Sequence, residues 1–312
     1  MSTVLIGHPD CFEHVTPPGH PERVDRLRAV EAVLNAEAFA HLRRFEAPLA
    51  TDEQLLRAHP AAHLAELAGA APLPGQDWTA IDGDTFLSAG TLAAARRAAG
   101  ANVMAVDMVL SGEAGNAFCG VRPPGHHAEA MRAMGFCFFN SAAVGALHAI
   151  AAHGLERVAI VDFDVHHGNG SQDIFERDGR VLYASSHEWP LYPGTGRAEE
   201  HGVGNIVNAP LPALSDGATF RQAYERLILP ALDRFAPELL IISAGFDAHR
   251  RDPLATLQLQ TDDFAWVTRR LCDVADRHCA GRVVSTLEGG YDLEALARSV
   301  AAHVTVLAER AQ

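Results

Sequence analysis

Apolar positions along the chain follow two patterns, and together these predict the fold class. Short runs of continuously apolar residues predict six strands, over residues 3–6, 117–121, 157–163, 181–184, 239–243 and 283–287. Apolar residues at helical spacing predict four helices between them, over residues 92–110, 140–153, 220–235 and 263–278. Strands that are apolar throughout are typical of parallel sheets buried on both faces. The pattern therefore predicts an α/β protein with an open, mainly parallel sheet and helices on both faces.

Length and composition favour one domain over residues 1–312. The chain is 48% hydrophobic and 21% charged, which is ordinary for a globular protein. Length alone allows two domains, but no linker rich in proline, glycine or serine and no run of charge marks a boundary. We therefore expect a single domain.

Net charge and cysteine content indicate which classes of partner and which cellular compartment to expect. A formal net charge of −14 without a stripe of lysine and arginine argues against nucleic acid as a partner. The first ten residues lack a basic segment, and their apolar run is too short for an export signal or a membrane span. The scattered cysteines are expected to be reduced thiols in a cytoplasmic protein: Cys11, Cys119, Cys137, Cys272 and Cys279.

Polar residues that follow two predicted strands have the chemistry of a metal site. In an open α/β sheet, ligands bind beyond the carboxyl ends of the strands, where loops open a crevice. Asp164 and His166, two residues apart in an extended segment, project to the same side and can meet one cation. Asp247 follows the strand predicted over 239–243 and completes an Asp/His/Asp set. Such a set leaves a coordination position open for water, as a hydrolytic zinc requires.

Two adjacent histidines after the strand 117–121 are candidates for acid and base catalysis. His126 and His127 can exchange protons near neutral pH. Asp162 is expected to orient one imidazole and Asn169 the other. A carboxylate partner raises the pKa of a histidine, whereas an amide has much less effect, so His127 opposite Asn169 would stay neutral and ready to act as a base.

A glycine pair, Gly289 and Gly290, precedes a tyrosine that could act on an oxyanion. The glycines allow a tight turn close to a ligand, and Tyr291 can then present its hydroxyl to developing negative charge. Aromatic residues on loops, Phe136 and Tyr192, could form the walls of a narrow channel. His167 faces away from His166 and is expected to be structural.

Together these motifs resemble the histone deacetylase family, within the arginase-deacetylase fold. The match runs from about His20 to Tyr291 and is carried by residues 122–129, 135–140, 162–170, 243–247 and 288–291. The Glu-Gly-Gly-Tyr turn and Asn169, where class I enzymes have aspartate, resemble the class II pattern of bacterial amidohydrolases. Tyr291 separates the chain from members that carry histidine there and have weak deacetylase activity.

The resemblance implies roles for residues in this chain. Zinc would be bound by Asp164, His166 and Asp247, with His126 and His127 as the tandem histidines and Tyr291 polarising the carbonyl. A structural potassium ion would be held by side-chain and main-chain oxygens of Asp162, Asp164, His166, Ser185 and Ser186.

The resemblance also implies a substrate channel and two further residues near it. The channel would include Gly135, Phe136, Tyr192, Leu254 and Gly289. Arg26 matches an arginine beside an internal cavity. Asp82 is a candidate for holding the substrate backbone.

The function implied is a zinc-dependent deacylase acting on an acetyl-lysine peptide or a related acylated amine. An acetylpolyamine amidohydrolase is the first alternative, although Leu254 stands where polyamine-selective relatives place a glutamate. A ureohydrolase would need a two-manganese cluster with more carboxylates. An acyl-ligand sensor without turnover also stays open, and so does association into homo-oligomers.

Overall fold

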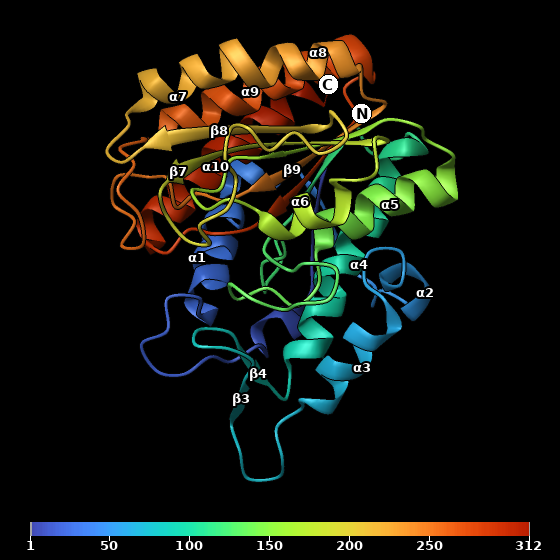
Figure 1. Ribbon diagram of the computed structural model, residues 1–312, viewed down its shortest axis with the longest axis vertical. Coiled ribbons are helices and arrows are strands. Elements are labelled where there is room, and N and C mark those ends of the chain that lie inside the picture. Colours follow the sequence, from blue (N-terminus) through green and yellow to red (C-terminus); the bar gives the residue numbers. More distant parts are fainter. Residues whose placement is uncertain (1, 312) are drawn as a thin grey trace.

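A single eight-stranded sheet forms the centre of the computed structural model, which describes residues 2–311 (Figure 1). Residues 1 and 312 of the predicted domain lie outside the described residues. The strand order is β2-β1-β5-β10-β9-β6-β7-β8, and each neighbouring pair is parallel. The strands are β1 (Thr3–Gly7), β2 (Arg43–Glu46), β5 (Asn116–Cys119), β6 (Val158–Asp162), β7 (Val181–Trp189), β8 (Ile206–Pro212), β9 (Leu239–Ala244) and β10 (Val283–Leu287). The predicted parallel α/β sheet is confirmed.

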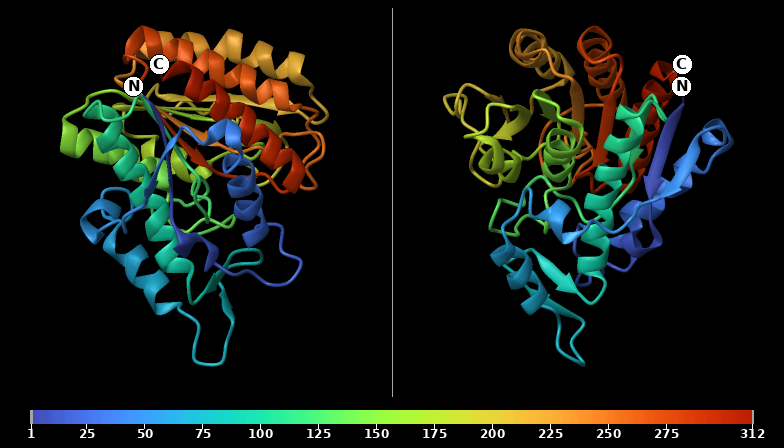
Figure 2. Two further views of the ribbon diagram at one scale, coloured as in Figure 1. Left: turned by 180° about the vertical axis from the view of Figure 1, so that it is seen from behind. Right: turned by 90° about the vertical axis from the view of Figure 1, so that its right-hand side faces the viewer.

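Helices cover both faces of this sheet, as Figures 1 and 2 show. One face is covered by α2 (Asp52–Leu55), α3 (Ala61–Gly69), α4 (Thr91–Leu110), α5 (Ser141–His153) and α6 (Asn169–Phe175). The other is covered by α1 (Val24–Leu34), α7 (Gly217–Ala223), α8 (Leu229–Phe235), α9 (Thr261–His278) and α10 (Leu293–Arg310). Within residues 2–311, none of the helices combines the length and apolar character needed to cross a membrane.

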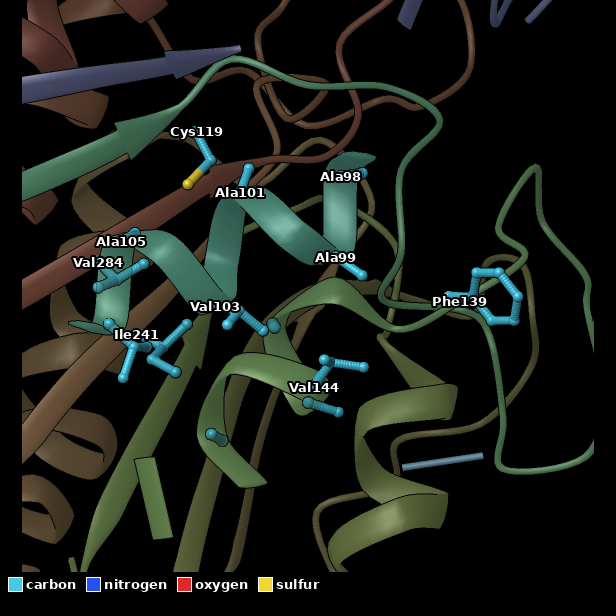
Figure 3. Packing of buried hydrophobic residues seen from close by; sticks show 14 of the residues in the cluster. Ala98, Ala99, Ala101, Val103, Ala105, Cys119, Phe139, Val144, Ile241 and Val284 are labelled. Carbon is cyan, nitrogen blue, oxygen red and sulfur yellow. The ribbon is translucent and has the colours of Figure 1, made fainter. Parts of the chain in front are cut away.

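Alternation along the buried strands divides the core into two layers. In β5, Ala117 and Cys119 pack into one layer, while Phe118 between them packs into the other. Successive side chains of a strand point to opposite faces, so a strand between two helical layers buries its side chains on both faces. Figure 3 shows the first layer, where side chains of α4 and α5 gather beside Ile241 and Val284.

The ends of several elements differ from the sequence prediction. The strand predicted over 117–121 ends at Cys119, whereas the strand predicted over 181–184 continues to Trp189 because it pairs with β8. The helix predicted over 220–235 begins earlier, and its middle is a π-helical turn, Tyr224–Ile228. Pro230 follows this turn and has no N–H to donate to the preceding helical turn.

A two-stranded hairpin projects beyond the main sheet. It pairs β3 (Trp78–Ala80) with β4 (Phe86–Ser88), and it stands apart at the lower end of Figure 1. Its connection, residues 81–85, turns back toward the carboxyl ends of the main strands, where the candidate catalytic residues lie.

The close contact between α4 and the segment 48–50 yields a first prediction. A Cβ placed at Gly100 would lie 1.9 Å from the carbonyl oxygen of Pro48 and 2.9 Å from the amide nitrogen of Ala50. Backbone atoms cannot move aside cheaply, so Gly100→Ala should lower the free energy of unfolding by about 3 kcal/mol. Gly69→Ala is the matched control, since a Cβ at Gly69 meets nothing within 4 Å. Urea unfolding measures both, and equal stability of the two variants would contradict the packing described.

Candidate active site

Three buried side chains from two neighbouring strands meet at the carboxyl edge of the sheet. Asp164 and His166 follow β6, and Asp247 follows β9, which pairs with β6. One potential ligand atom from each lies within 4.8 Å of the others. Nδ1 of His166 lies 3.1 Å from a carboxylate oxygen of Asp164 and 3.1 Å from one of Asp247. The structure thus brings together the Asp/His/Asp set that the strand ends predict.

Backbone N–H groups fix both carboxylates in place. The amide of Val165 donates to Asp247 Oδ1 at 2.8 Å, and the amide of Gly289 donates to Asp164 Oδ2 at 2.8 Å. Gly289 can approach this closely because it lacks a side chain: a Cβ there would lie 2.1 Å from Asp247 Oδ2. At Gly245 a Cβ would lie 2.0 Å from Asp164 Oδ2. The two glycines therefore leave room for the carboxylates rather than for substrate.

The donor set and its electrostatics fit a bound divalent cation. Burial, together with the neighbouring Asp164 carboxylate, raises the pKa of Asp247 to about 6. A single imidazole nitrogen carries at most one proton, yet it faces two carboxylates. A cation among the three side chains would offset this repulsion, and two carboxylate oxygens with one imidazole nitrogen are ligands that zinc accepts.

Two histidine dyads lie beside this cluster. His126 Nδ1 is 2.9 Å from Asp162 Oδ2, and His127 Nδ1 is 2.8 Å from Asn169 Oδ1. The Asn169 amide in turn donates to Glu129 at 2.7 Å, which fixes its carbonyl oxygen toward His127. The two orienting contacts are those that the sequence analysis expects.

The surroundings of the two imidazoles shift their pKa values in opposite directions. Burial lowers the pKa of His126, but the carboxylates of Asp164 and Asp162 outweigh it and raise that pKa well above the ordinary value. Burial and the charges of His126 and His166 hold the pKa of His127 well below the ordinary value. These opposite shifts favour the charged form of His126 and the neutral form of His127.

Glu288 is a buried residue of the site that the sequence analysis assigned no role. Its Oε2 accepts hydrogen bonds from the amides of Gly125 and His126, at 2.6 and 3.2 Å. Burial raises the pKa of this carboxyl to about 7. Glu288 thus anchors the backbone that presents both histidines. Its place beside the Gly-Gly-Tyr turn was the only signal available in the sequence.

The Tyr291 ring is held from below by a buried arginine. The Arg26 guanidinium lies over the ring, 4.8 Å from its centroid, and donates to the carbonyl oxygens of Gly290 and Glu288. The Tyr291 amide donates to Asp252 Oδ2 at 2.7 Å. Burial raises the pKa of Tyr291 well above the ordinary value, so the phenol keeps its proton and can donate it in a hydrogen bond.

A second buried arginine ties the N-terminal loop to the histidine loop. Arg122 forms a two-pronged ion pair with Glu22, with N–O distances of 2.8 and 2.7 Å, and both side chains are fully buried. Glu22 also accepts from Arg26 at 3.0 Å. This network joins the beginning of α1 to the loop after β5.

A cavity of about 220 Å³ opens directly over these groups. It is lined by Pro21, Asp84, His127, Gly135, Phe136, His166, Leu191, Tyr192, Leu254 and Tyr291. Most of the wall is apolar or aromatic, and the polar lining residues include Asp84, His127, His166 and the Tyr291 phenol. This shape suits a slender alkyl chain that ends in a polar group.

One prediction for the channel requires correction. Gly289 does not line the cavity, because its backbone lies against the carboxylates below. Asp82 is absent from the lining, and its Oδ1 accepts from the amides of Asp84 and Thr85 within its own turn. Its role in holding the substrate backbone stays a prediction. Asp84, which the turn directs to the cavity, is the acidic residue there.

The remaining candidates lie outside the cavity. His167 is engaged by Thr195 at 2.8 Å and Gln172 at 3.0 Å, which agrees with its expected structural position. Ser185 lies 3.0 Å from His187 Nδ1, and Ser186 donates to Tyr224. Their role as potassium ligands stays a prediction.

Comparison with known proteins identifies the family. A family model described as the histone deacetylase domain matches residues 20–307. The chain belongs to the histone deacetylase family. It is 42% identical over 286 residues to a histone deacetylase-like amidohydrolase of Pseudomonas aeruginosa, covering 89% of this chain and 74% of that protein. It is 38% identical over 304 residues to a probable deacetylase of Archaeoglobus fulgidus, covering 94% and 82%.

A solved structure of the same family supports the fold. The crystal structure of the HDA15 HD domain superimposes with a TM-score of 0.93 at 36% identity, covering 99% of this chain and 89% of that one. Membership of a family of deacetylases and amidohydrolases supports a hydrolytic enzyme.

The anchoring by Glu288 yields a second prediction. Glu288→Leu removes the acceptor of two buried amides, so it should lower the free energy of unfolding by about 3 kcal/mol. Glu288→Gln keeps a carbonyl oxygen in this position and should lose less. Urea unfolding compares the two variants, and equal losses would show that the two hydrogen bonds contribute nothing.

Proposed function

We propose that the chain is a zinc-dependent amidohydrolase that removes acetyl or a related short acyl group from a lysine side chain of a peptide or protein. The observation that carries this proposal is that His166 of the Asp/His/Asp cluster lines the same cavity as His127 and Tyr291. A metal ligand, a base and a phenol therefore face one cavity.

Zinc fits the cluster and supplies one part of the chemistry. When bound by Asp164, His166 and Asp247, it would polarise the acyl carbonyl and lower the pKa of a water molecule. Asp162, Ser185 and Ser186 remain the proposed oxygen ligands of a potassium ion.

The residues of the chain would carry out the proton transfers. The apolar wall formed by Phe136, Leu191 and Leu254 takes up the alkyl chain of the substrate and excludes water. His127, which is neutral, accepts a proton from the attacking water and later delivers it to the departing amine nitrogen. The Tyr291 hydroxyl donates a hydrogen bond to the oxygen that gains negative charge.

His126 would contribute charge rather than proton transfer. It stays protonated beside Asp162, and its Nε2 lies 3.8 Å from Asp164 Oδ2. Its positive charge favours the negative charge that develops on the substrate oxygen, and it also keeps His127 neutral.

An N-acetylated polyamine is the second candidate substrate, because Asp84 lies at the cavity. Leu254 in the same lining offers no charge to a remote ammonium group, and this favours acetyl-lysine. The test is turnover of an acetyl-lysine peptide and of an N-acetylated polyamine at equal concentration by zinc-loaded protein. Preference for the peptide supports the proposal, and preference for the polyamine reverses the substrate assignment. Failure to hydrolyse any acylated amine would favour a ligand sensor.

Removal of the phenolic hydroxyl tests its role in catalysis. Tyr291→Phe should lower kcat by a factor of about a hundred or more, because a donor to the oxyanion is lost while the ring remains. KM should change little, since the ring still lines the cavity. Steady-state kinetics with the acetyl-lysine peptide measure both constants, and wild-type kcat would exclude this role.

The neutrality of His127 gives a prediction about pH. Asn169→Asp places a carboxylate against His127, which stabilises the imidazolium and raises the histidine pKa. A base must be unprotonated, so the acidic limb of the kcat/KM profile should move to higher pH.

Asn169→Asp should be introduced into a Glu129→Gln variant, because Glu129 accepts a hydrogen bond from Asn169 and would repel the new carboxylate. The pH profile should be recorded for Glu129→Gln with and without Asn169→Asp. An unchanged acidic limb would show that His127 is not the base.

A further inference from the structure

Phe136, in the wall of the channel, has a backbone conformation that side chains rarely adopt. Its φ angle is 69°, in the left-handed region, and the preceding Gly135 has a φ of 55°. A phenylalanine in this region is strained, and such strain persists only where surrounding groups maintain it. Gly135 lies directly against the His127 ring, because a Cβ there would lie 2.5 Å from that ring.

Thr85, which lies outside the cavity lining, provides the contact that maintains this conformation. Its Oγ1 accepts a hydrogen bond from the Phe136 amide at 3.1 Å, and the side chain is fully buried. The same hydroxyl donates to Asp84 Oδ1 at 3.1 Å. The hydroxyl thus uses its single proton toward Asp84 and a lone pair toward Phe136.

His20 packs against the Phe136 ring. The two rings meet edge to face with centroids 4.8 Å apart, and His20 Nε2 lies 2.8 Å from the carbonyl oxygen of Asp84. His20 Nδ1 accepts from the Glu22 amide, so Nε2 carries the proton and donates it to Asp84. The Phe136 ring then packs against Tyr291, with centroids 5.9 Å apart.

We propose that Thr85 is a positioning residue that determines how tightly the channel holds the alkyl chain of the substrate. Its hydroxyl fixes the strained Phe136 backbone, and this places the aromatic ring against Tyr291 in the cavity that Leu254 also lines. The inference rests on the proposed deacylase function and adds a residue that acts through Phe136 rather than on the substrate itself.

The first test compares three variants of two threonines in the same hairpin. Thr85→Val keeps the shape of the side chain and removes the acceptor, so KM for the acetyl-lysine peptide should rise about tenfold while kcat stays within about threefold. Thr85→Ser retains the hydroxyl and should have the wild-type KM. Thr79→Val is the matched control, because Thr79 lies in β3 and the Phe136 amide donates to Thr85 instead, and it should leave both constants unchanged. A Thr85→Val variant with wild-type KM, or a Thr85→Ser variant with the same defect, would overturn the proposal.

A double-mutant cycle distinguishes positioning from general support of the fold. Glycine adopts the left-handed conformation without strain and carries no ring to position. In the Phe136→Gly background, Thr85→Val should therefore raise KM less than twofold. The same tenfold increase in both backgrounds would show that Thr85 acts independently of Phe136.

Hydrogen exchange makes the inference testable apart from turnover. The Phe136 amide should be protected in the wild type and in Thr85→Ser, and should exchange at least tenfold faster in Thr85→Val. If the wild type fails to hydrolyse the peptide, the proposed function fails, but this exchange pattern still decides whether Thr85 holds Phe136. Equal protection in all three proteins would overturn the positioning role.

Discussion

The site depends on two buried carboxylates, Asp164 and Asp247, that face one imidazole away from solvent. Buried charge is costly unless it is paired and hydrogen-bonded, and each carboxylate here has a backbone amide, from Gly289 or Val165. The buried carboxylates also require glycine at positions 245 and 289, because any side chain there would occupy the space of a carboxylate. A cation in the cluster would compensate the remaining negative charge, which is why the donor set fits a metal.

The same buried charges also affect the loop after β5, which carries His126 and His127. His126 lies near Asp162 and Asp164 and so favours its charged form, while burial and the charges of His126 and His166 make His127 favour the neutral form. Adjacent residues of identical chemistry thereby gain different proton affinities from their surroundings. Glu288 and the Glu22–Arg122 ion pair hold this loop in position, so that each histidine keeps its own set of neighbours.

The sequence predicted what depends on periodicity and on strand ends, and it missed what depends on loop geometry. Continuous apolar strands indicated a parallel sheet, and polar residues after β6 and β9 indicated a shared site, because neighbouring parallel strands end at one edge. The edge strand β2, with the sequence Arg-Arg-Phe-Glu, has no such apolar signal. Nothing in the local pattern shows that Asp84 rather than Asp82 reaches the cavity, or that Thr85 contacts Phe136, 51 residues away. Those contacts are set by how the hairpin folds back on the sheet.

The most direct test of the central claim is turnover as a function of bound zinc. Protein freed of metal by chelation would be titrated with zinc, and both the zinc content and the hydrolysis of an acetyl-lysine peptide would be followed, in the wild type and in Asp247→Asn. We expect no turnover without metal, a linear rise that saturates at about one zinc per chain, and weak zinc binding by the variant. Full turnover by the metal-free protein, or wild-type zinc binding by Asp247→Asn, would contradict this claim.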